Sequence, residues 1–389
     1  MMCGRLGGDS TSRLPKAPVK KRILILTVHH GASHERVAKA LRRALLDADP
    51  ELTVEIADAL EHTAKWFRFY YDSYLVPLKL WPGLWARIEN AQHSHDSTGP
   101  RWLYRRAAKS LFQFIAQFDP AAVVAVEVGT CELAALMKRE WGARFELVAI
   151  PTGLDADRPW AQPEVRLYIV AAEETARELE AAGVSRKQIR TSGQPIDPAF
   201  GPIADRAQIR GKLGVKPDVP LLLMLFGGMG AGRPEVIARS LRQLEAPIEI
   251  VFIMGRNKNL EGRMRRLADG RPNWRVLGWV ENMHDWMAAA DLALSKPGAS
   301  TVVEALASGL PMLAFDPLPG NERRACDWIE NNAVGLWVRN AGEIAPAVSR
   351  LLANRHELER LRRSALTHAR PRAAFDAARA ILELFRPAS

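Results

Sequence analysis

Short, continuous apolar runs alternate with amphipathic segments along most of the chain, and this alternation restricts the possible folds more than any other feature. The first run, Ile23–Leu26, precedes helical spacing of apolar residues over 34–46 and a second run at Val54–Ile56. A short run without alternating polar positions is typical of a strand that is buried on both faces of a parallel sheet. The opening of the chain therefore predicts a βαβ unit.

The alternation recurs in two blocks, which are separated by a segment rich in proline and glycine at 195–202. Such a segment favours a linker. The sequence therefore predicts an α/β protein with two Rossmann-like, doubly wound domains facing a central cleft, where ligands bind at the carboxyl ends of the strands. The further strands are expected at 122–126, 147–150, 167–171, 221–226, 248–253, 292–294 and 312–315, and further helices at 132–139 and 173–182.

The pattern also divides the chain into four expected segments. A disordered lead covers 1–20, the first domain covers 21–200 and the second covers 201–370. The last segment, 371–389, is expected to form a helix that packs back on the first domain.

Composition excludes several classes of protein. Three widely separated cysteines, Cys3, Cys131 and Cys326, argue against a disulfide framework and a zinc site. No apolar stretch reaches the roughly 20 residues that span a bilayer, and 1–20 lacks the apolar region of a signal peptide. We therefore expect a cytoplasmic protein without a bound metal or cofactor.

The formal net charge of +10 suits nucleic acid, an anionic membrane or a polyphosphate ligand. No helix-turn-helix, zinc-finger or RNA-binding signature accompanies this charge. The sequence therefore predicts no nucleic-acid partner.

Two loops that contain glycine lie between a predicted strand and a predicted helix. One holds Gly227, Gly228 and Gly230, and the other is 297–301. Backbone amides and the positive end of a helix bind phosphate well in such loops. The alternatives are a tight turn for the first loop and, for the second, a capping box formed by Thr301 and Glu304.

Aromatic and basic side chains are interleaved between the strands expected at 54–56 and 122–126. Tryptophan and tyrosine favour the headgroup zone of a membrane, and arginine there attracts anionic lipid. The alternative is that the aromatic side chains fill the core of the first domain. The residues assigned to the acceptor and the membrane are Trp66, Phe67, Tyr70, Tyr71, Trp81, Trp85, Arg105 and Arg106.

The second block carries the motifs KPGAST at 296–301, EAL at 304–306, GLP at 309–311, PGNE at 319–322 and NAVG at 332–335. GQPI at 193–196 and MGRN at 254–257 add to them. Together they resemble the GT-B glycosyltransferases that include monogalactosyldiacylglycerol synthases, processive diacylglycerol glucosyltransferases and, more distantly, MurG. The resemblance covers roughly 22–340 and is strongest in the second domain.

The resemblance implies an inverting, metal-independent transfer of a hexose from a UDP-sugar to a lipid hydroxyl. The acceptor is expected to be diacylglycerol, and the chain is expected to associate peripherally with the inner face of the cell membrane. The first domain would bind acceptor and an anionic membrane surface, and the second would bind the donor. The implied donor-binding residues are Gly227, Gly228, Gly230, Arg256, Val280, Met283, Gly298, Ser300, Thr301, Glu304, Asn321 and Glu322.

Within this group, Glu304 would bind the ribose, Val280 and Met283 would flank the uracil, and the glycine loops would hold the diphosphate. Asn321 and Glu322 would bind the sugar. The family has glutamine where this chain has the shorter Asn321, so the identity of the sugar stays open.

The resemblance also selects His34 as the general base, because an imidazole can accept the proton of a hydroxyl near neutral pH. The chain departs from the family in the segment TGLDADRPW at 152–160, where the family's Asp and His are replaced by Gly153 and Asp157. Asp155 and Asp157 are therefore reserve candidates. Two other functions stay open: transfer to a polyprenyl-linked acceptor, as in MurG, and a catalytically silent protein that binds nucleotide sugar at a membrane.

Overall fold

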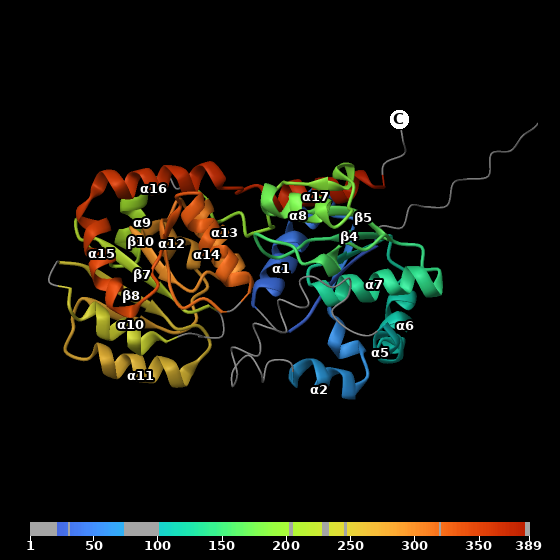
Figure 1. Ribbon diagram of the computed structural model, residues 1–389, viewed down its shortest axis with the longest axis horizontal. Coiled ribbons are helices and arrows are strands. Elements are labelled where there is room, and N and C mark those ends of the chain that lie inside the picture. The colour runs from blue at the N-terminus through green and yellow to red at the C-terminus, as the bar shows by residue number, and fades with distance from the viewer. Residues whose placement is uncertain are drawn as a thin grey trace, which may run out of the picture.

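We describe a computed structural model of the chain, which defines 22–29, 32–73, 101–201, 205–227, 233–244, 247–318 and 320–385. The expected lead at 1–20, together with Gly228, Gly230, Trp81 and Trp85, lies outside these residues. Two parallel sheets of six strands each form the centres of two halves, with helices on both faces (Figure 1). The predicted fold class is confirmed.

The N-terminal sheet has the strand order β2-β1-β3-β4-β5-β6. Its central strands are buried on both faces, as their continuous apolar runs predicted. The strands are β1 (Arg22–Thr27), β2 (Thr53–Asp58), β3 (Ala122–Ala125), β4 (Glu146–Ala149), β5 (Val165–Ile169) and β6 (Ile189–Arg190). The helices are α1 (Ala32–Ala48), α2 (Lys65–Ser73), α5 (Arg101–Ala107), α6 (Lys109–Phe118), α7 (Val128–Trp141) and α8 (Glu173–Ala181).

The C-terminal sheet has the order β12-β11-β10-β7-β8-β9, and its direction of winding reverses between β7 and β10. The strands are β7 (Leu221–Leu225), β8 (Glu249–Ile253), β9 (Trp274–Leu277), β10 (Leu292–Ser295), β11 (Met312–Ala314) and β12 (Gly335–Trp337). The helices are α9 (Arg206–Lys212), α10 (Pro234–Leu241), α11 (Lys258–Ala268), α12 (Met283–Ala289), α13 (Ala299–Ala307), α14 (Asn321–Asn331), α15 (Ile344–Ala353) and α16 (Arg355–His368).

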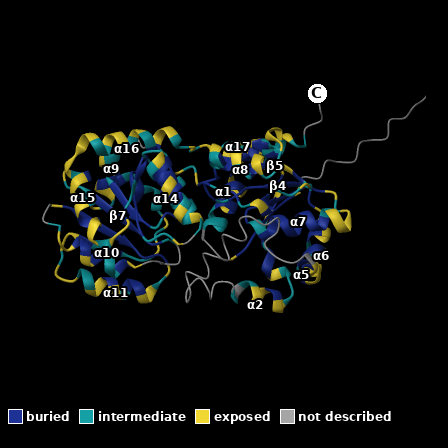
Figure 2. Cartoon of the chain, viewed as in Figure 1, coloured by how far each residue is buried: buried dark blue, intermediate teal, exposed yellow. Residues whose placement is uncertain are grey.

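Each predicted strand overlaps an observed one, but β6, β9 and β12 were not predicted. All three strands lie at sheet edges, and β6 and β12 are only two and three residues long. In each half the buried residues concentrate in the sheet and the exposed ones on the outer helices (Figure 2).

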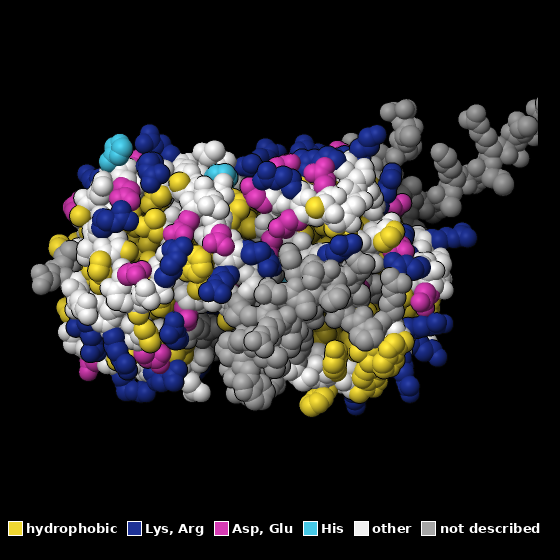
Figure 3. All heavy atoms as spheres, viewed as in Figure 1, with side chains coloured by type: hydrophobic (Ala, Val, Ile, Leu, Met, Phe, Trp, Pro, Cys, Tyr) yellow, Lys and Arg dark blue, Asp and Glu magenta, His cyan; other side chains and the backbone are white. Residues whose placement is uncertain are grey.

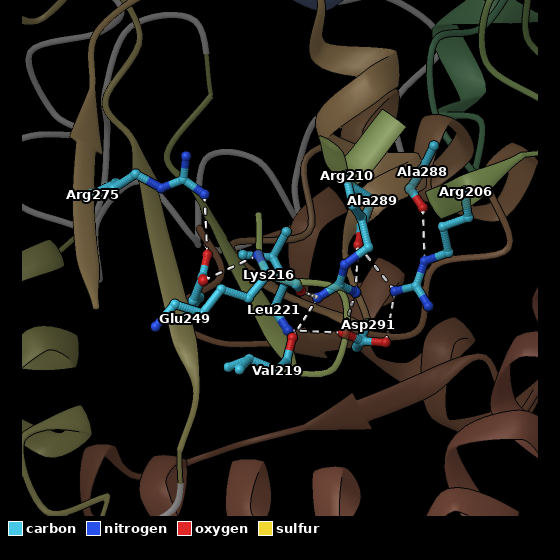
Figure 4. A network of polar contacts seen from close by, with 10 residues as sticks. All are labelled: Arg206, Arg210, Lys216, Val219, Leu221, Glu249, Arg275, Ala288, Ala289 and Asp291. Atoms are coloured by element: carbon cyan, nitrogen blue, oxygen red, sulfur yellow. Dashed lines mark hydrogen bonds and ion pairs between the residues drawn. The ribbon is translucent and has the colours of Figure 1, made fainter. Parts of the chain in front are cut away.

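A polar network attaches α9 to the C-terminal sheet (Figure 4). Asp291 accepts hydrogen bonds from Arg206 Nη2 at 2.6 Å, Arg210 Nη1 at 3.2 Å and the Leu221 amide at 2.8 Å. The Arg210 side chain is only 6% exposed. The charge on Asp291 therefore compensates a buried guanidinium, and the two arginines hold the pKa of this carboxyl below its usual value despite burial.

The chain crosses between the halves twice, once after β6 and again between α16 and α17 (Ala373–Glu383). Helix α17 packs on α1 of the N-terminal half, and Ala374, Ala377 and Ala378 join the core around Ile23. Gly193 adopts a φ of +99° at the crossing, and a Cβ there would lie 2.5 Å from Cβ of Arg370. Glycine thus permits the close approach of the two crossing segments.

Candidate functional site

A cavity of about 380 Å³ lies between the two halves and is lined by residues of both. This volume lies within the range of about 300–1,000 Å³ that is common for ligand sites. Its N-terminal wall includes Ser33, His34, Glu127 and Thr152, which come from α1 and from the ends of β3 and β4. Its C-terminal wall includes Gly227, Lys296, Gly298, Ser300, Thr301, Asn321 and Glu322.

His34 lies in the first turn of α1, where Nδ1 makes two polar contacts with described residues of the N-terminal half. This atom is 2.9 Å from the carbonyl oxygen of Val126 and 3.0 Å from Oγ1 of Thr152. A carbonyl only accepts, so Nδ1 carries the hydrogen and Nε2 keeps its lone pair. Burial lowers the pKa of His34, which favours the neutral ring. His34 can therefore accept a proton at Nε2 near neutral pH.

Glu127 is a cavity residue that the sequence analysis did not select. Its side chain accepts a hydrogen bond from Tyr71 Oη at 2.8 Å and another from the Thr130 amide at 3.0 Å, which caps α7. The negative charge of Glu127 acts to raise the pKa of His34, against the effect of burial. Glu127 directly follows the predicted strand 122–126, and this position at a strand's carboxyl end was the available signal.

Asp155 and Asp157, the reserve bases, both face Arg324 of α14. Asp155 pairs with Arg324 Nε, and Oδ1 of Asp157 is 3.3 Å from Arg324 Nη2. These ion pairs connect the N-terminal and C-terminal halves at the edge of the cavity. A catalytic use of either carboxylate remains a prediction.

The N-terminus of α13 contacts the N-terminal half directly. The amide of Ser300 donates to Ser33 Oγ at 3.1 Å, and the two serine hydroxyl oxygens are 2.5 Å apart. Gln194 Nε2 also donates to Ser300 Oγ, at 3.2 Å. A serine hydroxyl thus accepts from a helix-terminal amide of the kind that binds phosphate in other proteins.

Glu304 is buried in α13, with 3% of the residue exposed, and accepts from Arg36 Nη1 at 3.0 Å and 2.8 Å. Gly298, not Thr301, is the N-cap residue of this helix, so the capping box is wrong. Burial raises the pKa of Glu304 to about 7, although the charge of Arg36 opposes this effect. Arg36 was not selected from the sequence, and its partner lies 268 positions away.

Asn321 and Glu322 lie at the start of α14 and both line the cavity. Glu322 pairs with Nζ of Lys296 and accepts from the Leu318 amide at 2.8 Å. The side-chain oxygen of Asn321 accepts from Arg324. The motif containing Lys296 was recognised, but this lysine was not assigned to the site.

A second cavity, of about 310 Å³, brings together Arg256, Val280 and Met283. It also shares Arg36 and Ser300 with the wall of the first cavity. The guanidinium of Arg256 lies over the Trp279 ring, 4.1 Å from its centre, as in cation–π pairs. The donor residues assigned from the sequence therefore divide between two adjoining cavities.

The positions of the aromatic residues on α2 and α5 correct part of the predicted acceptor and membrane surface. Phe67 is 1% exposed and packs edge-on against Tyr104, so its assignment to the membrane is wrong. Tyr71 is half-buried and bonded to Glu127. Exposed aromatic side chains gather over α2 and α5 (Figure 3), and they are Trp66, Phe69, Tyr70 and Trp102. Arg105 and Arg106 are exposed beside them, and Arg105 lies 3.2 Å from Glu140.

Across the described ranges, no helix is both long enough and apolar enough to cross a membrane. The same residues contain no group of three or more His, Cys, Asp and Glu side chains that could hold a metal ion.

Glu304→Gln is expected to gain stability relative to the unaltered chain as the pH rises from about 4.5 to above 7. Because the pKa of Glu304 is raised from 4.5 to about 7, the folded chain keeps a proton in this window that the unfolded chain has released. The free energy of unfolding therefore falls with rising pH, by up to about 3 kcal/mol at roughly 1.4 kcal/mol per pKa unit. The glutamine of the variant does not titrate, so its contribution to the free energy of unfolding does not change with pH.

Urea unfolding of both chains at about pH 5 and about pH 8 measures this effect, since other titrating groups cancel in the difference. If the unfolding free energies of the two chains differ by the same amount at both pH values, the buried environment assigned to Glu304 is wrong.

Two family models match most of the chain. The model described as monogalactosyldiacylglycerol (MGDG) synthase matches residues 34–196, and the glycosyltransferase family 28 C-terminal domain matches 222–363. A probable monogalactosyldiacylglycerol synthase 2 of Oryza sativa subsp. japonica is 29% identical, covering 95% of this chain and 82% of that relative. The monogalactosyldiacylglycerol synthase of Spinacia oleracea is 28% identical, covering 96% and 74%. Both relatives are described as chloroplastic.

Solved structures share the two-domain fold. Acinetobacter baumannii MurG has a TM-score of 0.61 and 14% identity, covering 93% of this chain and 99% of that one. Anabaena Alr3699/HepE in complex with UDP-glucose has a TM-score of 0.57 and 13% identity, again covering 93% and 99%. At these identities the likeness concerns the fold.

Proposed function

Because this chain belongs to the GT-B glycosyltransferases of the monogalactosyldiacylglycerol synthase family, we propose that it transfers a hexose from a UDP-sugar to a lipid hydroxyl, with inversion. The proposed acceptor is diacylglycerol. The observation that carries the proposal is the cavity between the halves, where His34, whose Nδ1 contacts the Val126 carbonyl, lies with the glycine-containing loops of the C-terminal half. The direct experiment is mass spectrometry of the lipid product formed from a UDP-hexose and diacylglycerol.

The donor would extend across the two adjoining cavities. The uracil would lie by Arg256, Val280 and Met283, and the ribose hydroxyls would donate to Glu304. The diphosphate would meet Gly227, Gly298 and the N-terminus of α13, where Ser300 and Thr301 supply donors and the helix dipole favours an anion. Lys296, Asn321 and Glu322 would contact the sugar. Gly228 and Gly230 keep their predicted role at the diphosphate.

The proposed reaction follows from the neutral form of His34, in which Nδ1 carries the hydrogen and Nε2 can accept a proton. As the acceptor oxygen bonds to C1 of the sugar, its proton passes to Nε2 of His34 and the bond from C1 to the β-phosphate oxygen breaks. The electron pair of that bond leaves with the diphosphate. Attack from the face opposite the leaving group inverts the anomeric centre. Glu127 would stabilise the imidazolium that forms, because its negative charge favours a protonated His34.

The exposed aromatic surface on α2 and α5 supports association with a membrane. Trp66, Phe69, Tyr70 and Trp102 are 43%, 76%, 48% and 67% exposed. Exposed basic residues surround them, namely Lys65, Arg68, Arg105, Arg106 and Lys109. Tryptophan and tyrosine prefer the headgroup zone, and basic residues are attracted by the anionic lipids of the inner leaflet. We therefore propose that the enzyme associates peripherally with the inner face of the cell membrane.

The double substitution Trp66→Ala/Phe69→Ala is expected to weaken binding to anionic vesicles at least tenfold, because burying a large aromatic side chain contributes about 1.5–3 kcal/mol. Vesicle sedimentation measures the partition coefficient. Phe375→Ala is the control, since Phe375 is 36% exposed but belongs to α17. Equal binding by the double variant and the control would contradict the assigned surface.

A further inference from the structure

Arg36 lies where separate parts of the site meet. It lines the cavity that contains His34, the cavity that contains Val280 and Met283, and a smaller cavity beside Gly227. Arg36 belongs to α1 of the N-terminal half, whereas Glu304 belongs to α13 of the C-terminal half. A ligand that extends from one large cavity to the other must therefore pass this ion pair.

The ion pair with Arg36 occupies the Glu304 carboxylate, to which the ribose hydroxyls of the proposed donor would bind. Nη1 of Arg36 donates to both carboxylate oxygens of Glu304, at 3.0 Å and 2.8 Å. Glu304 is 3% exposed, while the Arg36 side chain is 30% exposed. Glu304 lines the second cavity, so a ribose bound there would meet a carboxylate whose two oxygens already accept from Arg36. The ribose would compete with the guanidinium for these oxygens, and the guanidinium also lines the first cavity.

The charges in the wall of the first cavity indicate where the guanidinium would go. Four carboxylates line the described part of this wall, Glu127, Asp155, Asp157 and Glu322, against the cations Arg36 and Lys296. Lys296 pairs with Glu322 of its own half. Asp155 and Asp157 pair with Arg324 at the edge of the cavity. Of the cations in the described wall, Arg36 is therefore the one that ribose binding would release toward a diphosphate.

We propose that Arg36 is the residue that neutralises the donor diphosphate: the ribose displaces it from Glu304, and the released guanidinium binds the phosphate oxygens. This inference rests on the proposed UDP-sugar donor. The exchange conserves hydrogen bonds, because the ribose hydroxyls replace the arginine as donors to the buried carboxylate. Guanidinium groups bind phosphate through paired, charge-assisted hydrogen bonds. When C1 separates from the β-phosphate oxygen, the charge of Arg36 stabilises the electron pair that the oxygen retains.

Calorimetric titration with UDP and with uridine tests the proposal, because only UDP carries the diphosphate. Arg36→Gln should bind UDP about ten- to a hundredfold more weakly than the unaltered chain, as expected for the loss of a charged hydrogen bond. The same variant should bind uridine as well as the unaltered chain or more tightly, since nothing competes for Glu304. Turnover with saturating donor should fall about a hundredfold.

Arg177→Gln is the matched control, because Arg177 forms an exposed ion pair with Glu174 on α8. It should leave both affinities unchanged. If Arg36→Gln does not fold, the double variant Arg36→Gln/Glu304→Gln removes the buried charge as well. Compared with Glu304→Gln alone, that variant should lose most of its preference for UDP over uridine.

Three results would overturn the proposal. Equal weakening of UDP and uridine would show that Arg36 only supports the fold. Unchanged affinity for UDP would remove Arg36 from the diphosphate site and leave the proposed function intact. Failure of the unaltered chain to bind UDP would refute the proposed donor and this assignment together.

Discussion

His34→Ala is expected to slow sugar transfer about a hundredfold or more, because general-base assistance typically contributes about 10² to 10⁴ in rate. Its UDP affinity should stay within about twofold, since the proposed donor contacts come from the C-terminal half and Arg36. His34→Asn should be equally slow, because an amide cannot accept a proton at neutral pH. Initial rates at saturating donor and acceptor measure the effect.

The pH profile gives a second measure of the same role. The turnover of the unaltered enzyme should fall with decreasing pH as His34 becomes protonated, and because burial lowers the pKa of His34, this limb should lie below pH 6.5. The limb should be absent from His34→Ala. His356→Ala is the control, since His356 is exposed on α16. Near-normal turnover of His34→Ala, together with inactivity of Asp155→Asn or Asp157→Asn, would assign the base elsewhere.

Asp291→Ala is expected to lower the free energy of unfolding by about 3–5 kcal/mol, the usual cost of removing one partner from a buried ion pair. The substitution leaves the guanidinium of Arg210, whose side chain is 6% exposed, without its carboxylate. It also removes the acceptor of the Leu221 amide at the start of β7. Urea unfolding followed by circular dichroism measures the change.

Asp376→Ala is the matched control for this prediction. Asp376 forms an i,i+3 ion pair with Arg379 on α17, where the arginine side chain is 63% exposed. Exposed pairs contribute about 0–1 kcal/mol, so the control should unfold nearly as the unaltered chain does. Similar losses in both variants would mean that the network around Asp291 does not hold α9 to the sheet.

The fold was predictable because its signal is local. Runs such as Ile23–Leu26 and Leu221–Phe226 are continuous in the sequence, and burial on both faces of a parallel sheet requires that continuity. β6 and β12 were missed because strands of two and three residues are too short to form a recognisable apolar run. The glycine-containing loops could be located because each follows such a run.

The contacts that join the halves were not predictable from local pattern. Arg36 and Glu304 are 268 positions apart, and Arg324 and Asp155 are 169 apart. Their pairing depends on how the two sheets are oriented, which composition and periodicity do not encode. Phe67 was misassigned because successive residues of a helix point about 100° apart, so a run of adjacent aromatic residues cannot all share one face. Trp66 is exposed while Phe67 enters the core.

The measurement that tests the central claim most directly is mass spectrometry of the lipids formed when the full-length chain is incubated with a panel of UDP-hexoses. Diacylglycerol and a polyprenyl phosphate-linked acceptor are supplied in separate reactions, each in anionic vesicles. Our account predicts a new lipid with the mass of diacylglycerol plus one hexose residue and the release of UDP, with both products formed at least about a hundredfold more slowly by His34→Ala. A glycosylated product only from the polyprenyl-linked acceptor, or UDP binding without any product, would contradict it.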